Sequence, residues 1–313
     1  MTRFNTHVED HGTHVTIHTP DPFSYQQVVA YLNRSENECL HRVDGATVYK
    51  AIPINTEIAV MAVSNPTPSR IEIRLLESGG CAVSDALLAA ARYVWEWFDL
   101  DANLVPFYQL ATGDPVLKTL VTDYYGLRLI GVPDLFEALC WAVMGQQINL
   151  AFAYTLKRRF VEAFGTRTTV RGHTYWIFPD ACRISELTPS ELTALGFTTR
   201  KSEYLAEIAR WMRRGAITKQ GLLALPDLES VVDALTDIRG VGKWTANYVA
   251  MRCLRHRSAF PIDDVGLHHA VSRLLGMNQK PTREELGVLF APWHGYEAYA
   301  TFYFWRHLLA PEY

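Results

Sequence analysis

The chain has 313 residues, of which 49% are hydrophobic and 20% charged, and its formal net charge is −3 at pH 7. This composition is typical of a globular protein with one large core or two to three smaller ones. No apolar run approaches the roughly eighteen residues needed to span a bilayer. The N-terminus MTRFNTHVEDHG is polar and lacks an apolar signal segment, so we expect a cytoplasmic protein without a membrane partner. The small net charge gives no global argument for nucleic acid and leaves a local basic face open.

The first hundred residues mix strand and helix signals. Alternating apolar residues predict strands over His14–His18, Ala46–Ile52 and Arg70–Leu75, whereas Tyr25–Leu32 and Ser84–Phe98 have helical character. We therefore expect a small antiparallel sheet backed by two helices, as a first domain over residues 1–103.

Beyond about residue 104 strand signals fade and helical periodicity dominates. The segment starting at Thr188 begins with a capping box, in which Pro189 and Glu191 occupy the first and third helical positions. The pattern predicts an all-α domain over residues 104–313. Its further expected helices are Asp134–Gly145, Ala151–Phe164, Ser202–Arg213 and Asp227–Thr236.

The cysteines are far apart, and no CxxC pair occurs. This spacing disfavours a structural zinc site or an iron–sulfur cluster. We expect the cysteines to be small buried apolar residues. They are Cys39, Cys81, Cys140, Cys182 and Cys253.

Residues 235–248, LTDIRGVGKWTANY, place a Gly-Val-Gly turn between two helices. Gly240 and Gly242 permit a tight turn in which Val241 fills the core while the backbone amides face outward. Such amides at a helix N-terminus bind anions, and a phosphate diester is a natural ligand. Lys243 adds a positive charge. An ordinary helix–turn–helix corner is the alternative, because a bare GVG between helices is weak evidence.

The helix after this turn stacks aromatic residues. Trp244, Tyr248 and Met251 follow each other at helical spacing on one face, and Ala246, Val249, Ala250 and Cys253 form a second apolar face. A helix with two apolar faces is either fully buried or lines a pocket.

Two adjacent carboxylates, Asp263 and Asp264, follow in the apolar stretch AFPIDDVGL. Burying charge there is costly unless it is compensated. Asp264 directly precedes a predicted helix that ends at Gly276, and is well placed to cap it. Capping would not compete with catalysis, because it fixes the orientation of the second carboxylate oxygen.

This combination of hairpin and aspartate resembles the helix–hairpin–helix DNA glycosylase superfamily. Within it the chain is similar to the bacterial 3-methyladenine DNA glycosylases of type II, the alkylation-repair branch. Gly131-Val132-Pro133-Asp134-Leu135-Phe136-Glu137-Ala138-Leu139 is similar to the entry to the helical domain of that family. Gly145-Gln146-Gln147-Ile148-Asn149 is similar to its duplex-entering loop, and the N-terminal half resembles its TBP-like α/β domain. The resemblance covers nearly the whole chain.

The resemblance implies an α+β fold with an active-site cleft between helical lobes, and a monomeric repair enzyme that acts on damaged double-stranded DNA in the cytoplasm, at the nucleoid. It assigns the catalytic role to Asp264 and gives Asp263 a structural or electrostatic one. The implied base pocket is lined by Tyr31, Trp244, Tyr248 and Trp305. The implied DNA contacts are Gly240, Val241, Gly242, Lys243, Thr245, Gln146 and Gln147, with a glutamine inserting into the duplex. The implied cation site, for a monovalent ion, uses main-chain carbonyls of Thr236, Ile238 and Val241, and no other cofactor is implied.

Bifunctional relatives carry a lysine two positions after the second hairpin glycine, where this chain has Trp244 and Lys243 comes one residue earlier. We therefore expect a monofunctional enzyme that hydrolyses the N-glycosidic bond of alkylated purines such as 3-methyladenine and 7-methylguanine. Base flipping would precede cleavage, and an abasic site would remain. Two alternatives stay open, an oxidised-purine glycosylase of the same superfamily and a non-catalytic protein that uses the hairpin only to bind phosphate.

Two further clusters of basic or histidine side chains are candidate binding sites. Lys157-Arg158-Arg159 is a candidate phosphate contact, although such a run on a helix is more often a solvated face. The N-terminal histidines are a weak candidate for a metal site, since the strand pattern equally predicts a solvated surface. They are His7, His11, His14 and His18.

Overall fold

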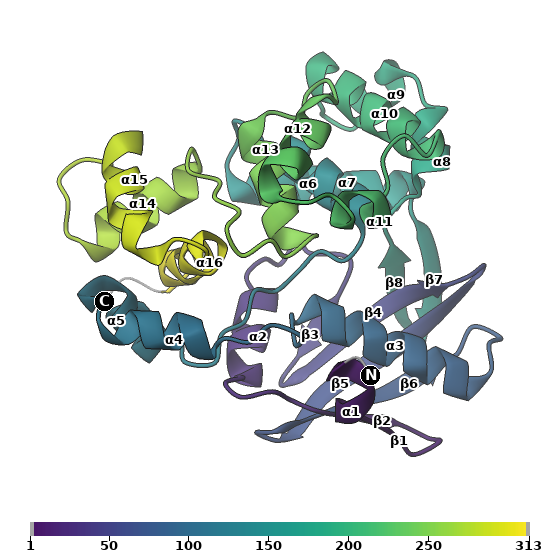
Figure 1. Cartoon of the computed structure of the whole chain (residues 1–313). Coiled ribbons are helices and arrows are strands. Elements are labelled where there is room, and N and C mark those ends of the chain that lie inside the picture. The colour runs from purple at the N-terminus through teal and green to yellow at the C-terminus, as the bar shows by residue number, and fades with distance from the viewer. Residues whose placement is uncertain (1–2, 311–313) are drawn as a thin grey trace.

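A computed structural model describes residues 3–310 of the chain. Its N-terminal part is a six-stranded antiparallel sheet with the strand order β1-β2-β6-β5-β4-β3, seen at the lower right of Figure 1. The strands are β1 (Val8–Asp10), β2 (Val15–His18), β3 (Arg42–Asp44), β4 (Thr47–Ile54), β5 (Glu57–Thr67) and β6 (Arg70–Glu77). Three of them match the predicted strands, whereas β1, β3 and β5 were not predicted.

Two helices, α2 (Tyr25–Leu32) and α3 (Val83–Trp97), cover one face of this sheet, as expected, and the short α1 (Arg3–His7) precedes it. Side chains alternate across β4: Val48 and Ile52 face the main core, whereas Ala51 belongs to a second cluster on the other side. Tyr25 of α2 donates a hydrogen bond to the Val63 carbonyl oxygen at 2.6 Å. The expected sheet with two backing helices is confirmed.

The rest of the chain is helical and forms two lobes, which Figure 1 shows at the left and at the top. One lobe joins α4 (Val105–Thr112) and α5 (Pro115–Asp123) to the C-terminal helices α14 (Val265–Leu274), α15 (Arg283–Phe290) and α16 (Glu297–Leu308). The upper lobe runs from α6 to α13. Its helices are α6 (Leu135–Gly145), α7 (Leu150–Phe164), α8 (Ala181–Ser185), α9 (Pro189–Thr193), α10 (Thr199–Arg213), α11 (Lys219–Leu223), α12 (Leu228–Thr236) and α13 (Lys243–Arg252).

The helical half is not entirely α-helical. Residues Thr166–Val170 (β7) and His173–Ile177 (β8) form an antiparallel hairpin that packs on the open face of the large sheet. Val170 and Tyr175 from this hairpin join Ala51 and Val60 in the second hydrophobic cluster. Short exposed strands of this kind carry little apolar periodicity, and the sequence pattern did not reveal them.

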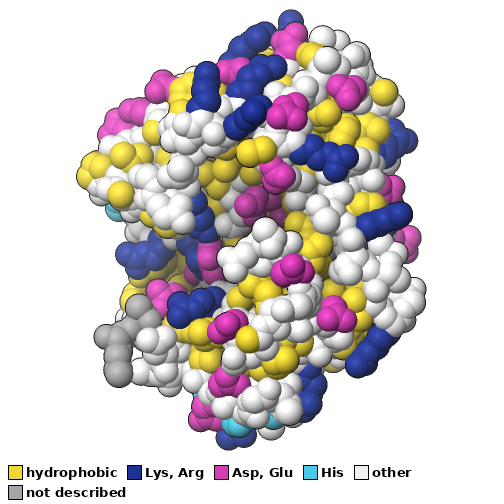
Figure 2. Space-filling view, turned by 90° about the vertical axis from the view of Figure 1, so that its right-hand side faces the viewer, with side chains coloured by type: hydrophobic (Ala, Val, Ile, Leu, Met, Phe, Trp, Pro, Cys, Tyr) yellow, Lys and Arg dark blue, Asp and Glu magenta, His cyan; other side chains and the backbone are white. Residues whose placement is uncertain are grey.

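One continuous hydrophobic core connects the sheet with both helical lobes. The segment that crosses between them is held by main-chain hydrogen bonds: the Gly131 amide donates to the Trp97 carbonyl oxygen at 2.7 Å and the Val132 amide to that of Arg252 at 2.8 Å. The ends of α3 and α13 therefore lie at one junction. On the face shown in Figure 2, basic and acidic side chains are intermingled rather than gathered by sign.

Candidate active site

Asp264 lies where the linker between the two lobes enters α14. Its Oδ1 atom accepts a hydrogen bond from the Leu267 amide at 2.7 Å, so Asp264 is the N-cap of the helix, as predicted. Asp263, its neighbour, is exposed and pairs with Arg283 at 3.0 Å. The two carboxylates therefore face different surroundings.

Two indoles donate hydrogen bonds to the Asp264 carboxylate. Trp305 Nε1, on α16, lies 2.9 Å from Oδ1, and Trp244 Nε1, on α13, lies 3.1 Å from Oδ2. Because Oδ1 already accepts from Leu267, these bonds fix the carboxylate plane and leave one lone pair on Oδ2 without a partner among the described residues. Three elements from both lobes thus hold one half-buried carboxylate.

The approach to this carboxylate is crowded at Gly266. A Cβ atom at this position would lie 3.0 Å from Asp264 Oδ1 and 3.8 Å from Trp305 Nε1. A side chain at Gly266 would therefore press on the carboxylate oxygen that accepts the Trp305 hydrogen bond.

The predicted base-pocket residues form one aromatic series. Trp244 stacks obliquely on Tyr248 at 5.7 Å between ring centroids, and Tyr248 on Trp305 at 5.9 Å. Phe302 continues the series toward Tyr31, from which its ring centre lies 4.7 Å away. The structure therefore brings together the four residues that the resemblance implied, and adds Phe302. Tyr31 comes from the N-terminal half, so both halves supply rings.

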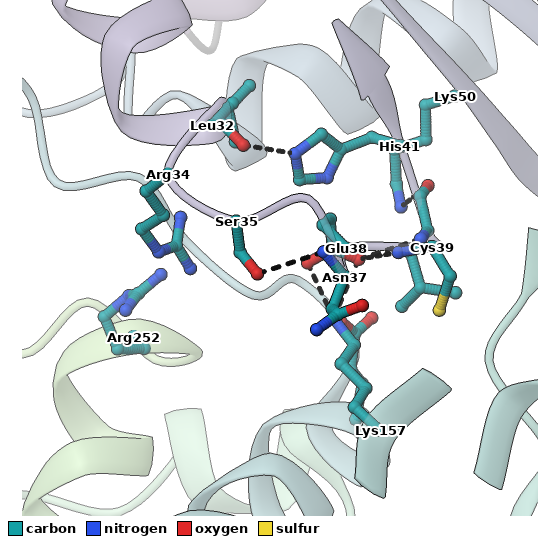
Figure 3. Close-up of polar contacts among 12 residues, drawn as sticks. Leu32, Arg34, Ser35, Asn37, Glu38, Cys39, His41, Lys50, Lys157 and Arg252 are labelled. Atoms are coloured by element: carbon teal, nitrogen blue, oxygen red, sulfur yellow. Dashed lines mark hydrogen bonds and ion pairs between the residues drawn. The ribbon is translucent and has the colours of Figure 1, made fainter. Parts of the chain in front are cut away.

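Sequence reasoning missed two arginines behind these rings. Arg252 is 4% exposed, donates to the Tyr248 hydroxyl at 3.1 Å and to the Ile130 carbonyl oxygen at 2.8 Å, and lies over the rings of Tyr31 and Phe302. Arg34 lies 4.0 Å from the Tyr31 ring centre, and Figure 3 shows its guanidinium turned toward that of Arg252. Burial raises the pKa of Tyr248, and Arg252 partly opposes that rise. The spacing of Arg252 four residues after Tyr248 was the available signal.

The hairpin after α12 has the predicted arrangement. Val241 is 4% exposed and fills the core. Gly240 has a φ of 95°, and a Cβ atom there would overlap the ring of Tyr204. Gly242 precedes α13 with no side-chain cap and with open space around it, so the first amides of α13 are free to bind an anion.

The other predicted DNA contacts divide into buried and exposed groups. Gln146 Nε2 donates to the Gly240 carbonyl oxygen and to Thr245 Oγ1, each at 3.0 Å, and Thr245 is 1% exposed. Their side chains therefore brace the hairpin. Gln147 is exposed, with a φ of 55°, at the tip of the loop between α6 and α7, and Lys243 is exposed beside the hairpin.

The basic run on α7 is solvated only in part, because Arg159 is exposed whereas Lys157 and Arg158 contact the N-terminal half. Lys157 is 6% exposed and pairs with Glu38 at 3.2 Å and Glu137 at 3.3 Å, while Arg158 donates to the Glu36 carbonyl oxygen at 2.7 Å. Figure 3 shows Lys157 of α7 reaching Glu38 in the loop after α2. The run therefore joins the helical half to the N-terminal half.

The described residues hold no group of histidine, cysteine and carboxylate side chains arranged for a metal ion. The Nε2 atom of His14 lies 3.8 Å from the Glu72 carboxylate, and that of His18 lies 3.1 Å from the Glu9 carboxylate.

No helix within residues 3–310 is long and apolar enough to cross a membrane. The cysteine prediction was only partly correct: Cys140 and Cys253 are buried, whereas Cys182 is exposed and Cys39 and Cys81 are half-buried.

Known proteins share these features. Residues 140–293 match the model of the HhH-GPD superfamily base excision DNA repair proteins, and residues 55–139 match that of the 8-oxoguanine DNA glycosylase N-terminal domain. The fold is similar to that of a 3-methyladenine DNA glycosylase from Archaeoglobus fulgidus, with a TM-score of 0.80, 22% identity and coverage of 93% of this chain and 96% of that one.

The fold and the site thus define a base excision DNA repair glycosylase of the HhH-GPD superfamily. The DNA-3-methyladenine glycosylase of Bacillus subtilis is 44% identical over 294 residues, which cover 94% of this chain and 97% of that protein. DNA-3-methyladenine glycosylase 2 of Escherichia coli is 30% identical over 200 residues, covering 64% and 66% of the two chains. The chain belongs to the DNA-3-methyladenine glycosylase family.

Proposed function

We propose that this enzyme hydrolyses the N-glycosidic bond of alkylated purines in duplex DNA, with Asp264 as its catalytic carboxylate. The observation that carries the proposal is the Asp264 carboxylate, held by two indoles and a helix amide at the end of an aromatic series. A base in a duplex must be extruded before a side chain can reach its glycosidic bond, and extrusion costs least for damaged bases. The exposed loop tip at Gln147 is our candidate for filling the gap.

The aromatic rings suit a cationic base. Alkylation at N3 or N7 gives a purine a positive charge, and contact with an aromatic face stabilises a cation by about 1 kcal/mol. Tyr31, Tyr248 and Phe302 already contact Arg252. We therefore assign the cationic base to the indoles of Trp244 and Trp305.

The positive charge also makes the base a good leaving group. The glycosidic bond breaks with its electron pair going to the base, which leaves neutral, and water adds to the sugar carbon with loss of a proton. Asp264 stabilises the developing positive charge on the sugar and orients the water through its free Oδ2 lone pair. No general acid is required, and one carboxylate suffices where ordinary glycosidases use two.

We further propose that the enzyme is monofunctional. Strand cleavage by this superfamily requires an amine that attacks the sugar, supplied by a lysine two positions after the second hairpin glycine. This chain has Trp244 at that position, and its indole donates a hydrogen bond to Asp264. Lys243 is exposed at the start of α13. The match of residues 55–139 to the 8-oxoguanine DNA glycosylase N-terminal domain concerns the sheet half, and Trp244 at the lysine position disfavours the oxidised-purine alternative. The non-catalytic alternative is disfavoured because a protein that only binds phosphate gains nothing from a carboxylate next to DNA.

Asp264→Asn tests the proposal directly. Base release from methylated duplex DNA should fall by about a thousand-fold or more, while binding is retained or strengthened, because the change removes a negative charge near phosphate. Strand integrity is followed in the same reaction, and an uncut abasic strand is expected. Asp263→Asn is the matched control and should release bases normally. Equal release by wild type and Asp264→Asn would refute the assignment.

Three finer points belong to the same proposal. A monovalent cation at the carbonyls of Thr236, Ile238 and Val241 would bridge to phosphate, and Ile238 already accepts one hydrogen bond, from the Val241 amide at 3.0 Å, which leaves it a second lone pair. Replacing potassium by tetramethylammonium should then weaken DNA binding.

We also propose that the protein is a monomer that acts in the cytoplasm on chromosomal DNA. Light scattering would check the monomer, and imaging of a tagged protein would check the location. The domain boundary proposed near residue 103 falls between α3 and α4 and would be tested by limited proteolysis.

A further inference from the structure

His268 makes two hydrogen bonds of an unusual kind next to the active site. It lies in the first turn of α14, four residues after Asp264. Its Nδ1 atom is 2.7 Å from the Pro281 carbonyl oxygen, and its Nε2 atom is 2.9 Å from the Ile262 carbonyl oxygen. Carbonyl oxygens only accept hydrogen bonds, so each ring nitrogen must supply a hydrogen.

A neutral imidazole cannot meet this requirement. It carries one N–H, so its second nitrogen would direct a lone pair at a carbonyl lone pair at hydrogen-bond distance. The doubly protonated ring satisfies both contacts with charge-assisted bonds. We infer that His268 is held as an imidazolium cation and acts as a positioning residue for Asp264.

The effect on Asp264 runs through the backbone. Ile262 stands two residues before Asp264, in a tight turn in which the Ile262 amide donates to the Phe260 carbonyl oxygen at 2.8 Å and the Asp264 amide to that of Pro261 at 2.9 Å. His268 ties this turn to Pro281, just before α15. Losing either bond would free the turn that carries the catalytic carboxylate, and small displacements of reacting groups cost large factors in rate.

A positive charge in the first turn of a helix opposes the helix dipole, so it needs compensation. Two carbonyl oxygens supply part of it, and Asp264, on the preceding turn, supplies negative charge. Asp263 is already paired with Arg283. The other charged or titratable side chains of α14 and of the segment 277–285 are His269, Arg273, Lys280, Glu284 and Glu285.

The protonation state can be measured without any assay of activity. In the intact protein, nitrogen NMR of the histidine rings should show two N–H groups on His268 at neutral pH, with the resonance assigned by its loss in His268→Gln. A single ring proton at neutral pH would overturn the inference, whether or not the enzyme releases bases. This arm is therefore separate from the proposed function, on which the positioning role rests.

The positioning role is tested by three variants. His268→Gln offers one amide donor group and no charge, His268→Lys keeps a cation with several donors, and His269→Gln, an exposed neighbour on α14, is the control. We expect single-turnover base release by His268→Gln to fall about ten- to a hundred-fold with DNA affinity unchanged, and His268→Lys to recover part of it.

Recovery of the rate by His268→Lys separates positioning from simple packing, because lysine restores a charged donor but not the shape of the imidazole ring. The positioning role fails if His268→Gln, shown to be folded by its thermal unfolding, keeps the wild-type rate, or if His268→Lys recovers none of the loss.

Discussion

At the scale of single residues, the main feature of the candidate active site is that three donor groups hold the Asp264 carboxylate. Asp264 accepts three hydrogen bonds, from an amide and two indoles. Hydrogen bonds to a charged group stabilise it by about 1.5–3 kcal/mol each. On the proposed function the two tryptophans have two roles, as rings that receive the base and as hydrogen-bond donors that orient the carboxylate.

Trp305→Phe separates these two roles. Phenylalanine keeps an aromatic ring beside Tyr248 but removes the donor to Asp264 Oδ1, so we expect the single-turnover rate to fall about ten-fold with little change in DNA affinity. Quenched-flow base release and a binding titration measure both quantities. Trp176→Phe, on the β8 hairpin, is the control. An unchanged rate would show that the Leu267 amide and Trp244 suffice to orient Asp264.

At the scale of elements, the hairpin between α12 and α13 uses its two glycines differently. Gly240 has a positive φ and lies against the Tyr204 ring, whereas Gly242 faces open space with an extended backbone. Packing within the protein therefore requires a glycine at position 240 but not at position 242. A glycine at position 242 matters only for a ligand, such as a DNA phosphate, that approaches the amides of α13.

Gly240→Ala should therefore destabilise the fold, and Gly242→Ala should not. The left-handed conformation alone costs an alanine about 1–2 kcal/mol, and the overlap with Tyr204 adds to it. Chemical denaturation of both variants measures the difference. Gly242→Ala should instead weaken DNA binding, because its methyl group occupies the space before the amides. Equal stability losses in the two variants would contradict this division.

The elements with a clear periodic pattern of apolar residues could be predicted from the sequence. Features that depend on contacts between distant parts of the chain could not. Asp264 capping α14, the Gly-Val-Gly turn and the helices α2, α3, α6 and α7 all follow from local patterns. The β7–β8 hairpin, the inward turn of Gln146 and the burial of Lys157 depend on partners far away in the chain. Arg252 was missed because a basic residue at a helix end is usually solvated.

At the scale of the whole molecule, a buried polar cluster joins the two halves. Its members include Glu38, His41, Lys50 and Lys157, shown in Figure 3. Burial lowers the pKa of His41 to about 4, and its Nε2 lies 3.0 Å from the Leu32 carbonyl oxygen. Burial works to raise the pKa of Glu38, but Lys157, His41, Arg34 and the Leu40 amide together outweigh burial and hold that pKa well below its usual range.

Both shifts make the protein sensitive to acid. An unfolded histidine takes up a proton below about pH 6.5, whereas folded His41 does so only near pH 4. Between these values the unfolded state binds the extra proton, so stability falls as the pH is lowered. Glu38 adds a further loss as the pH drops below about 4.3, the usual value for a glutamate.

His41→Gln removes the first part of this loss while keeping a donor for the Leu32 carbonyl. Between about pH 6.5 and pH 4.5, its unfolding temperature should fall less than that of wild type. Thermal unfolding followed by circular dichroism across this range measures it, and His173→Gln, an exposed histidine on β8, is the control. Parallel curves for wild type and His41→Gln would rule out His41 as the source.

Tyr31 gives the molecule a property that neither half has alone. Its ring lies on Phe302 of α16 and beside Arg252 of α13, yet it belongs to the helix that covers the sheet. The hairpin and Asp264 lie wholly in the helical part, so Tyr31 is the contribution of the sheet half to the aromatic series. On the proposed function, a helical fragment separated from the sheet would keep the hairpin and Asp264 but would lose the ring that backs Phe302 and Arg252. The sheet would then help to shape the base pocket as well as carry its own helices.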